Sequence, residues 1–236
     1  MGERMTNIDV HRTASLPARY RQSLAIAAWV TLLIPSSGYA QSAPAADRPP
    51  SVLLQLAESA ASLFDAAYAS DWRSASERMR SVSDAASMLP TDLPRPDVVS
   101  HLKAAVLYAA DGVNAHDRIE TMDEANTMTR LVADLSAMFQ APMPYEAAML
   151  GYYGRQLEFG LVSSRPSTLS DSATALQATW SRLESIVERR GHIDDAKRFT
   201  DIVAQLIAAR RPADYVAPTR AELAEAERIG QLLSRP

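Results

Sequence analysis

The sequence predicts an all-α protein: a helical bundle of about six to seven helices around one long central helix, preceded by a cleaved signal peptide. Apolar residues recur every three or four positions through almost every segment after residue 50, and no convincing alternating strand pattern occurs. The stretch 97–139 contains no proline and one glycine, Gly112, so a single helix about 60 Å long can cover it. The chain has no cysteine, so a packed core rather than disulfides must stabilise it.

The first forty residues have the pattern of a secretory signal peptide. Arg12, Arg19 and Arg21 precede an apolar run over 24–34, and small residues follow up to Ala40. The run of eleven residues is too short to cross a membrane, which takes about 20. We therefore expect cleavage after Ala40, a periplasmic or secreted location, and no membrane span in the mature chain.

The mature chain is expected to be a flexible linker over 41–50, rich in Ala, Ser and Pro, followed by one helical domain over 51–236. It carries 20 basic and 26 acidic residues, a net charge of −6. No segment combines clustered basic residues with aromatic ones. Nucleic acid and anionic membranes are therefore excluded as expected partners, because phosphate binding needs concentrated positive charge.

Two helices are expected before the long one. Ser51 is the predicted N-cap of the first, and Ser70 or Asp71 that of the second. Pro90, Pro94 and Pro96 then break the chain. The apolar stripes of these two helices are Leu53, Leu56, Ala57, Ala60, Phe64 and Ala67, and Trp72, Ala75, Met79, Val82, Ala86 and Leu89.

The long helix changes character along its length. Its stripe begins with Val98, Leu102, Ala105, Ala109 and Val113, and continues at the same spacing with His116, Glu120, Asp123, Thr127, Arg130 and Asp134. A kink or a change of packing partner near Asp111 and Gly112 would leave the polar half in water. The alternative is a polar interior, and the pattern alone leaves both open.

Four further helices complete the prediction. Prolines 142 and 144 separate the long helix from one over 145–159, and Gly191 separates helices over 171–190 and 192–211. Thr219 and Glu222 are predicted to form a capping box for a last helix over 220–233. Trp72, Trp180, Phe64 and Phe199 are expected to share one core.

Three residues of the long helix are candidate ligands for a divalent metal. His116, Glu120 and Asp123 are four and three positions apart, so one helix would place them in a narrow sector. An imidazole and two carboxylates suit Zn²⁺ and similar ions. Glu158 is a candidate from a second helix. The alternative is a solvated face, which acidic stretches of this kind most often form.

A second candidate is a polar network or ligand site made of Tyr153, Arg155, Glu158, Arg130 and Asp134. Gly154 would let another helix approach, while Arg155 reaches Asp123 or Asp134 across the bundle. The bland alternative is a surface ion pair between Arg155 and Glu158, three positions apart.

The function predicted from the sequence is an exported helical binding or accessory module that engages a protein partner or a small ligand of the cell envelope without enzymatic activity. Small envelope proteins of Gram-negative bacteria share this combination of features as a class. Nucleophile, zinc-protease and phosphate-loop motifs are absent, and so is the Glu-x-x-His spacing of di-iron bundles. No cofactor is predicted apart from the divalent-metal alternative, although His101 or His116 leaves non-covalent haem ligation open. An enzymatic function ranks third, with no residue assigned to it.

Overall fold

Helices account for almost all of the residues that the computed structural model describes, 48–139 and 144–234, and no strand occurs among them. The prediction of an all-α protein is therefore confirmed. The eight described helices are α1 (Ser51–Tyr68), α2 (Trp72–Ser87), α3 (Pro96–Ala115), α4 (Arg118–Ser136), α5 (Tyr145–Val162), α6 (Pro166–Arg189), α7 (Ile193–Ala208) and α8 (Pro212–Ser234).

Local sequence signals explain where several of these helices begin. Asp71 caps α2 by accepting a hydrogen bond from the Ser74 N–H at 3.1 Å, as predicted. Prolines at the first position of α3, α6 and α8 have the fixed φ of a helix and lack only an N–H that needs no partner there. The predicted Ser51 cap is wrong: Ser51 is the first residue of α1, and the residue before it, Pro50, has no side chain that can cap.

The continuous helix predicted over 97–139 is also wrong. The chain turns at His116, which has a left-handed backbone with φ of 54°, and Asp117 then caps α4 by accepting bonds from two backbone N–H groups at 3.0 Å. A Cβ on Gly112 would lie 2.8 Å from Oγ1 of Thr121, so glycine permits the close return of α4 along α3. The polar half of the predicted stripe belongs to this second helix, which has different neighbours.

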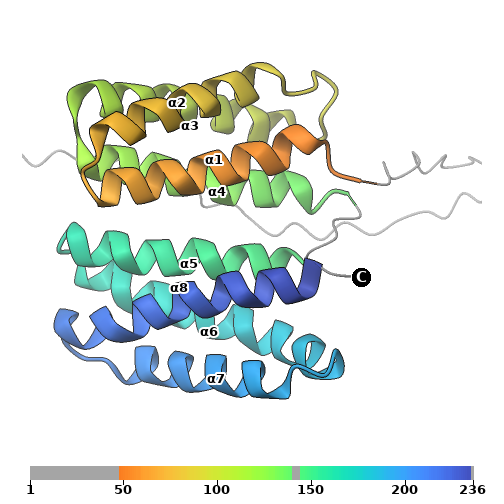
Figure 1. Ribbon diagram of the computed structural model, residues 1–236, viewed down its shortest axis with the longest axis vertical. Helices are drawn as coiled ribbons and strands as arrows, with labels where there is room; N and C mark the ends of the chain where they lie inside the picture. The colour runs from red at the N-terminus through yellow and green to blue at the C-terminus, as the bar shows by residue number, and fades with distance from the viewer. Residues whose placement is uncertain (1–47, 140–143, 235–236) are drawn as a thin grey trace, which may run out of the picture. The chain divides into compact units, whose positions relative to one another are not determined.

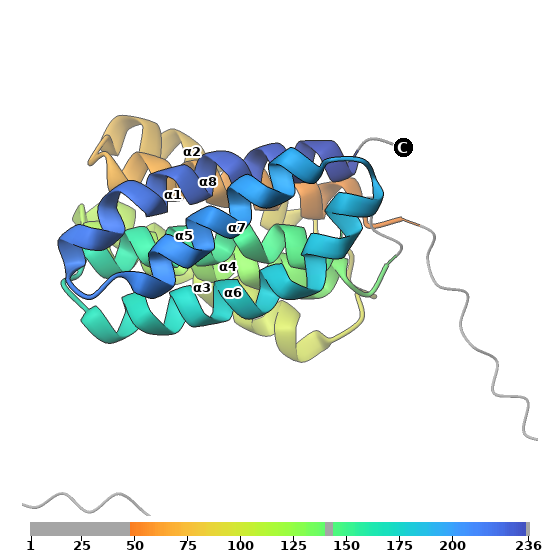
Figure 2. The same cartoon turned by 90° about the horizontal axis from the view of Figure 1, so that it is seen from below.

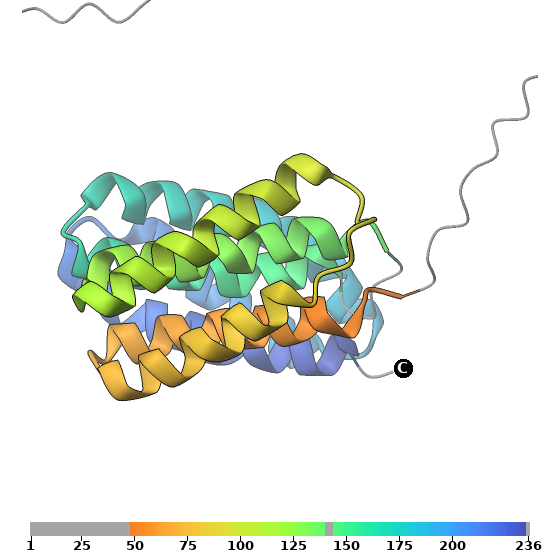
Figure 3. The ribbon, with the colours of Figure 1, turned by 90° about the horizontal axis from the view of Figure 1, so that it is seen from above.

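The helices form two groups of four (Figure 1). In the first group α1 packs on α2 and α4, and α3 packs on α2 and α4; in the second, α5 and α7 each pack on α6 and α8. Figure 3 shows α2 and α3 nearest the viewer, and Figure 2 shows α6, α7 and α8 from the opposite side. The groups meet where α4 packs against α5, whereas α1 and α8 have no comparable packing.

Each group has its own hydrophobic core. Phe64 lies in the first core with Trp72 partly buried against it, while Trp180 and Phe199 lie in the second. The predicted single core for these four aromatic residues is therefore wrong. Helices that follow one another in the sequence pack antiparallel and bury their apolar stripes against each other. Two groups of four helices therefore bury the stripes that were expected to meet in a single bundle.

The last helix differs most from the prediction. It begins at Pro212 rather than Arg220 and continues through Pro218. Thr219 and Glu222 therefore lie inside α8, where both side chains are buried, and do not form a capping box.

Some predictions fall on other parts of the chain. The signal peptide, its cleavage after Ala40, the linker up to residue 47, and Pro142 lie outside the described residues. Among the helices that the structure does describe, none combines the length and the apolar character needed to cross a membrane.

Candidate functional site

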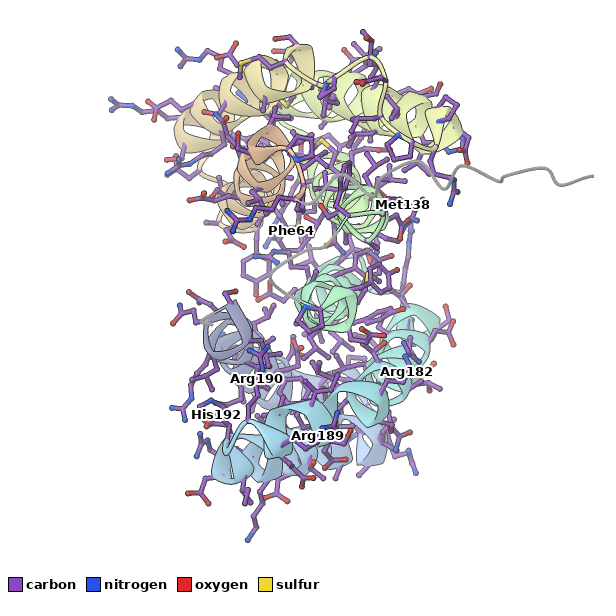
Figure 4. The ribbon with its side chains drawn as sticks, turned by 90° about the vertical axis from the view of Figure 1, so that its right-hand side faces the viewer. Phe64, Met138, Arg182, Arg189, Arg190 and His192 are labelled. Carbon is purple, nitrogen blue, oxygen red and sulfur yellow. The ribbon has the colours of Figure 1, made fainter. Side chains whose placement is uncertain are left out.

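A groove with a volume of about 930 Å³ lies between α1, α5 and α8. Its walls combine small residues with charged ones. Seen along the helices in Figure 4, α1 of the first group faces α8 of the second, and the labelled Phe64 lies at this junction. The residues lining the groove include Glu58 and Asp65 from α1, Ala147, Ala148, Gly151 and Arg155 from α5, and Leu223, Ala224, Ala226, Glu227, Gly230, Gln231 and Ser234 from α8.

Arg155 is the cation among the charged residues of the groove wall. Its side chain is 18% exposed, and its Nε lies 3.7 Å from Oδ1 of Asp65. Its Nη1 donates to the backbone oxygen of Gly151 at 3.4 Å, and its guanidinium carbon lies 5.9 Å from the centroid of the Phe64 ring. Both polar contacts are longer than the usual 2.7–3.2 Å of an N–H···O bond, so neither is a strong hydrogen bond.

The partner of Arg155 was not predicted. The sequence suggested Asp123, Asp134 or the nearby Glu158, and the structure pairs Arg155 with Asp65 instead. Asp65 lies ninety residues earlier in the chain, and nothing local connects the two. The Arg155 side chain is mostly covered, while the Asp65 side chain is 65% exposed.

Glu222 lies deeper, against α5. Its side chain is fully buried at 0% exposure, and neither carboxyl oxygen has a hydrogen-bond partner. A Cβ on Gly154 would lie 1.9 Å from Oε2 of Glu222, so this glycine makes room for the carboxyl group. The prediction that Gly154 admits another helix is correct, and that helix is α8.

Burial raises the pKa of Glu222 well above its ordinary value of 4.5, against the opposing positive charge of Arg155 and with a further increase from Glu158. Folding therefore shifts this carboxyl group towards its neutral acid form, compared with the unfolded chain. Glu222 is not predicted as a site residue from the sequence, because Thr219 and Glu222 match a helix cap. Pro212 is the signal that could have identified it, since this proline starts α8 earlier and places Glu222 inside the helix.

Glu158 also belongs to this cluster. Burial and, to a smaller extent, the negative charge of Asp65 raise its pKa to about 7, while the positive charges of Arg155 and Arg220 oppose the increase. Burial likewise raises the pKa of Asp65, and Arg155 opposes that increase. Carboxyl groups on α1, α5 and α8 thus all interact electrostatically with the Arg155 guanidinium.

The other residues of the predicted network lie elsewhere. Arg130 pairs with Asp134 on α4 at 3.0 Å, and the Tyr145 hydroxyl donates to Asp134 at 3.0 Å. Burial and this bond raise the pKa of Tyr145 to about 12. Tyr153 is half-buried and packs edge-on against Tyr152, with ring centroids 5.1 Å apart. The structure therefore brings Arg155 and Glu158 together and leaves Arg130 and Asp134 in a separate cluster.

The predicted metal ligands do not share one helix. His116 ends α3 and stacks on Trp72, with ring centroids 4.9 Å apart, while Glu120 and Asp123 lie on α4. The spacing argument therefore no longer applies to His116. No group of three or more His, Asp or Glu side chains is placed to hold a metal ion in the described ranges. Metal binding stays a prediction without structural support.

Comparison of the chain with protein-family models, curated proteins and solved structures finds no match.

Proposed function

We propose that this chain is an exported, non-enzymatic binding module that holds a small organic cation, of the linear polyamine type, in the groove between α1, α5 and α8. The observation that carries the proposal is a groove of about 930 Å³ whose walls carry more negative than positive charge. Its volume falls within the range of about 300–1,000 Å³ found for small-molecule sites.

The carboxylates of the groove are poorly compensated. Glu58 and Glu227 form no ion pair within the described residues, and the partner of Glu227 is the amide of Gln231 at 3.2 Å. Arg155 faces Asp65 only at 3.7 Å. Three carboxylates against one guanidinium give the groove a negative potential, which attracts cations and repels phosphates and carboxylates.

The placement of these charges favours an elongated ligand. Glu58 and Asp65 are seven residues apart on α1, so they stand about 10 Å apart along the helix axis. Glu227 faces them from α8, and the small residues Gly151 and Gly230 leave the space between open. A linear polyamine can place an ammonium group near each carboxylate while its methylene segments contact the alanine and glycine surface.

Calorimetry with spermidine tests the proposal. The mature protein is expected to bind with a Kd below about 1 mM at low ionic strength, and affinity should fall as salt rises. Replacing both Glu58→Gln and Glu227→Gln should weaken binding at least about tenfold, since each 1.4 kcal/mol is a factor of ten.

The matched control is Glu188→Gln on α6, an exposed carboxylate outside the groove, which should bind spermidine like the wild type. Equal affinity of the wild type and the Glu58→Gln/Glu227→Gln variant would reject the groove as the site. Absence of binding by the wild type would reject the ligand class.

A further inference from the structure

Arg155 lies between two sets of carboxyl groups with different access to solvent. On one side Asp65 lines the groove with 65% of its side chain exposed; on the other Glu222 is fully buried beside Gly154. The guanidinium group has no short polar contact to hold it in its present place, since its two partners lie at 3.7 and 3.4 Å. A modest change in charge can therefore redirect it.

Unpartnered buried atoms mark the alternative place for the guanidinium. The Nε of Arg155 and both carboxyl oxygens of Glu222 are buried without hydrogen-bond partners. Buried polar atoms are nearly always bonded, so a donor and two acceptors left open in neighbouring side chains call for an explanation. Arg155 and Glu222 are close enough for the positive charge to act on the carboxyl group. A neutral carboxyl has little hold on a cation, whereas an ionised one would bind it strongly.

The charged groups acting on these acids come from three helices. Within the described residues, Glu158 is influenced by Asp65 of α1, Arg155 of α5 and Arg220 of α8, and Glu222 by Arg155 and Glu158 of α5. Asp65 is influenced by Arg155 and by Glu227 of α8. Arg155 is the cation common to all three carboxyl groups.

We propose that the groove is proton-gated through Arg155. While Glu158 and Glu222 are protonated, Arg155 remains beside Asp65 and neutralises the negative charge of that carboxylate. When they lose those protons, Arg155 turns to them, and Asp65 becomes available to a cationic ligand. This regulation rests on the proposed function, because it concerns the same groove.

The gate links cation binding to proton release. A cation at Asp65 displaces Arg155 towards Glu158 and Glu222, and a positive charge beside these groups favours their ionised forms. By reciprocity, a higher pH strengthens cation binding by the same factor. Affinity for spermidine should therefore rise about tenfold between pH 6 and 8.5, the size of a typical coupling between two sites.

The first test needs no ligand. Nitrogen-15 NMR follows the Nε–H signal of Arg155 from pH 5 to 9 in the wild type and in the Glu158→Gln/Glu222→Gln variant, whose side chains mimic the protonated acids. The gate predicts a shift of this signal as pH rises in the wild type, and a nearly constant signal in the variant. A signal that does not change with pH in the wild type overturns the gate.

The second test measures spermidine affinity at pH 6 and 8.5. The wild type should show the tenfold increase, whereas the Glu158→Gln/Glu222→Gln variant should change less than about threefold. Glu188→Gln serves again as the control and should follow the wild type. If the NMR shift occurs and spermidine fails to bind at either pH, the cation proposal fails and the exchange of Arg155 stands. If spermidine binds with equal affinity at both pH values, the groove stands and the gate fails.

Discussion

Gly154 of α5 and Glu222 of α8 face each other so closely that an added Cβ on the glycine would lie 1.9 Å from Oε2 of the glutamate. The same Cβ would lie 2.6 Å from Cδ2 of Leu223. The absence of a side chain on Gly154 thus leaves room on α5 for the buried carboxyl group of Glu222 on α8. The contact places the Glu222 carboxyl group where the positive charge of Arg155 acts on it.

Gly154→Ala should destabilise the protein even though alanine favours a helix. The methyl group has to displace Glu222 and Leu223, and such overpacking typically costs about 1–3 kcal/mol, against a gain of up to about 1 kcal/mol in helix propensity. Urea unfolding measures the difference. Gly151→Ala is the matched control, since its Cβ would meet only Nη1 of Arg155 at 3.5 Å. A Gly154→Ala protein as stable as Gly151→Ala would contradict the close contact.

Glu222→Gln should change how stability depends on pH. A carboxyl whose pKa is raised on folding binds its proton more tightly in the folded state, so its contribution is complete below the ordinary pKa of 4.5 and is lost as pH rises towards the folded value. The loss amounts to at most about 1.4 kcal/mol per pH unit. Glutamine keeps the shape of the neutral acid without this loss.

The measurement is the free energy of unfolding of wild type and Glu222→Gln across pH 4.5–8.5. Near pH 4.5 the two should differ by less than about 1 kcal/mol, and at pH 8 the variant should be the more stable by more than about 1 kcal/mol. Comparing the two proteins cancels the titration of groups that do not interact with Glu222. Parallel curves would show that Glu222 ionises as easily in the folded chain as in the unfolded one.

Arg155→Met should cost little stability at pH 6, at most about 1 kcal/mol. The ion pair with Asp65 is long and its carboxylate is 65% exposed, and methionine keeps the contact with Phe64. Because folding favours the neutral form of Glu222, replacing Arg155 leaves no unpaired negative charge at that buried residue. Asp65→Asn should have a similarly small effect in thermal unfolding. A loss of about 3–5 kcal/mol for Arg155→Met would instead indicate a buried ion pair.

The two tryptophans should differ in importance. Trp180 is 3% exposed, lies 4.5 Å from Phe199 between ring centroids, and donates from Nε1 to Oγ1 of Thr200 at 2.9 Å. Trp180→Ala should therefore cost about 3–5 kcal/mol in chemical unfolding. Trp72 is only half-buried and stacks on His116, so Trp72→Ala should cost about 1–2 kcal/mol. Equal losses would contradict the difference in burial between the two tryptophans.

Local patterns account for much of the fold. Helical periodicity predicted where most helices lie, and Asp71 signalled the start of α2 because its carboxylate reaches the N–H of Ser74 three residues later. The break at His116 was missed because nothing in the stripe prohibits a helix there. Asp117 can cap a helix, but an aspartate inside a polar stretch is an equally ordinary surface residue.

The candidate site was predicted only in part, because some of its residues come from helices that are distant in the sequence. Gly154, Arg155 and Glu158 stand together on one helix, so their relation was visible in the sequence. Asp65 and Glu222 come from α1 and α8, and they join the site only when two groups of helices meet.

The sequence by itself determined the helical class, the absence of disulfides and the helix on which Arg155 and Glu158 lie, because periodicity and composition act within a few residues of the chain. Only the tertiary structure decided that α4 returns along α3, that α1, α5 and α8 enclose the groove, and that Glu222 is buried rather than capping a helix. These features depend on which faces pack across long separations in sequence, and the cost of burying a carboxyl group arises only when another helix covers it.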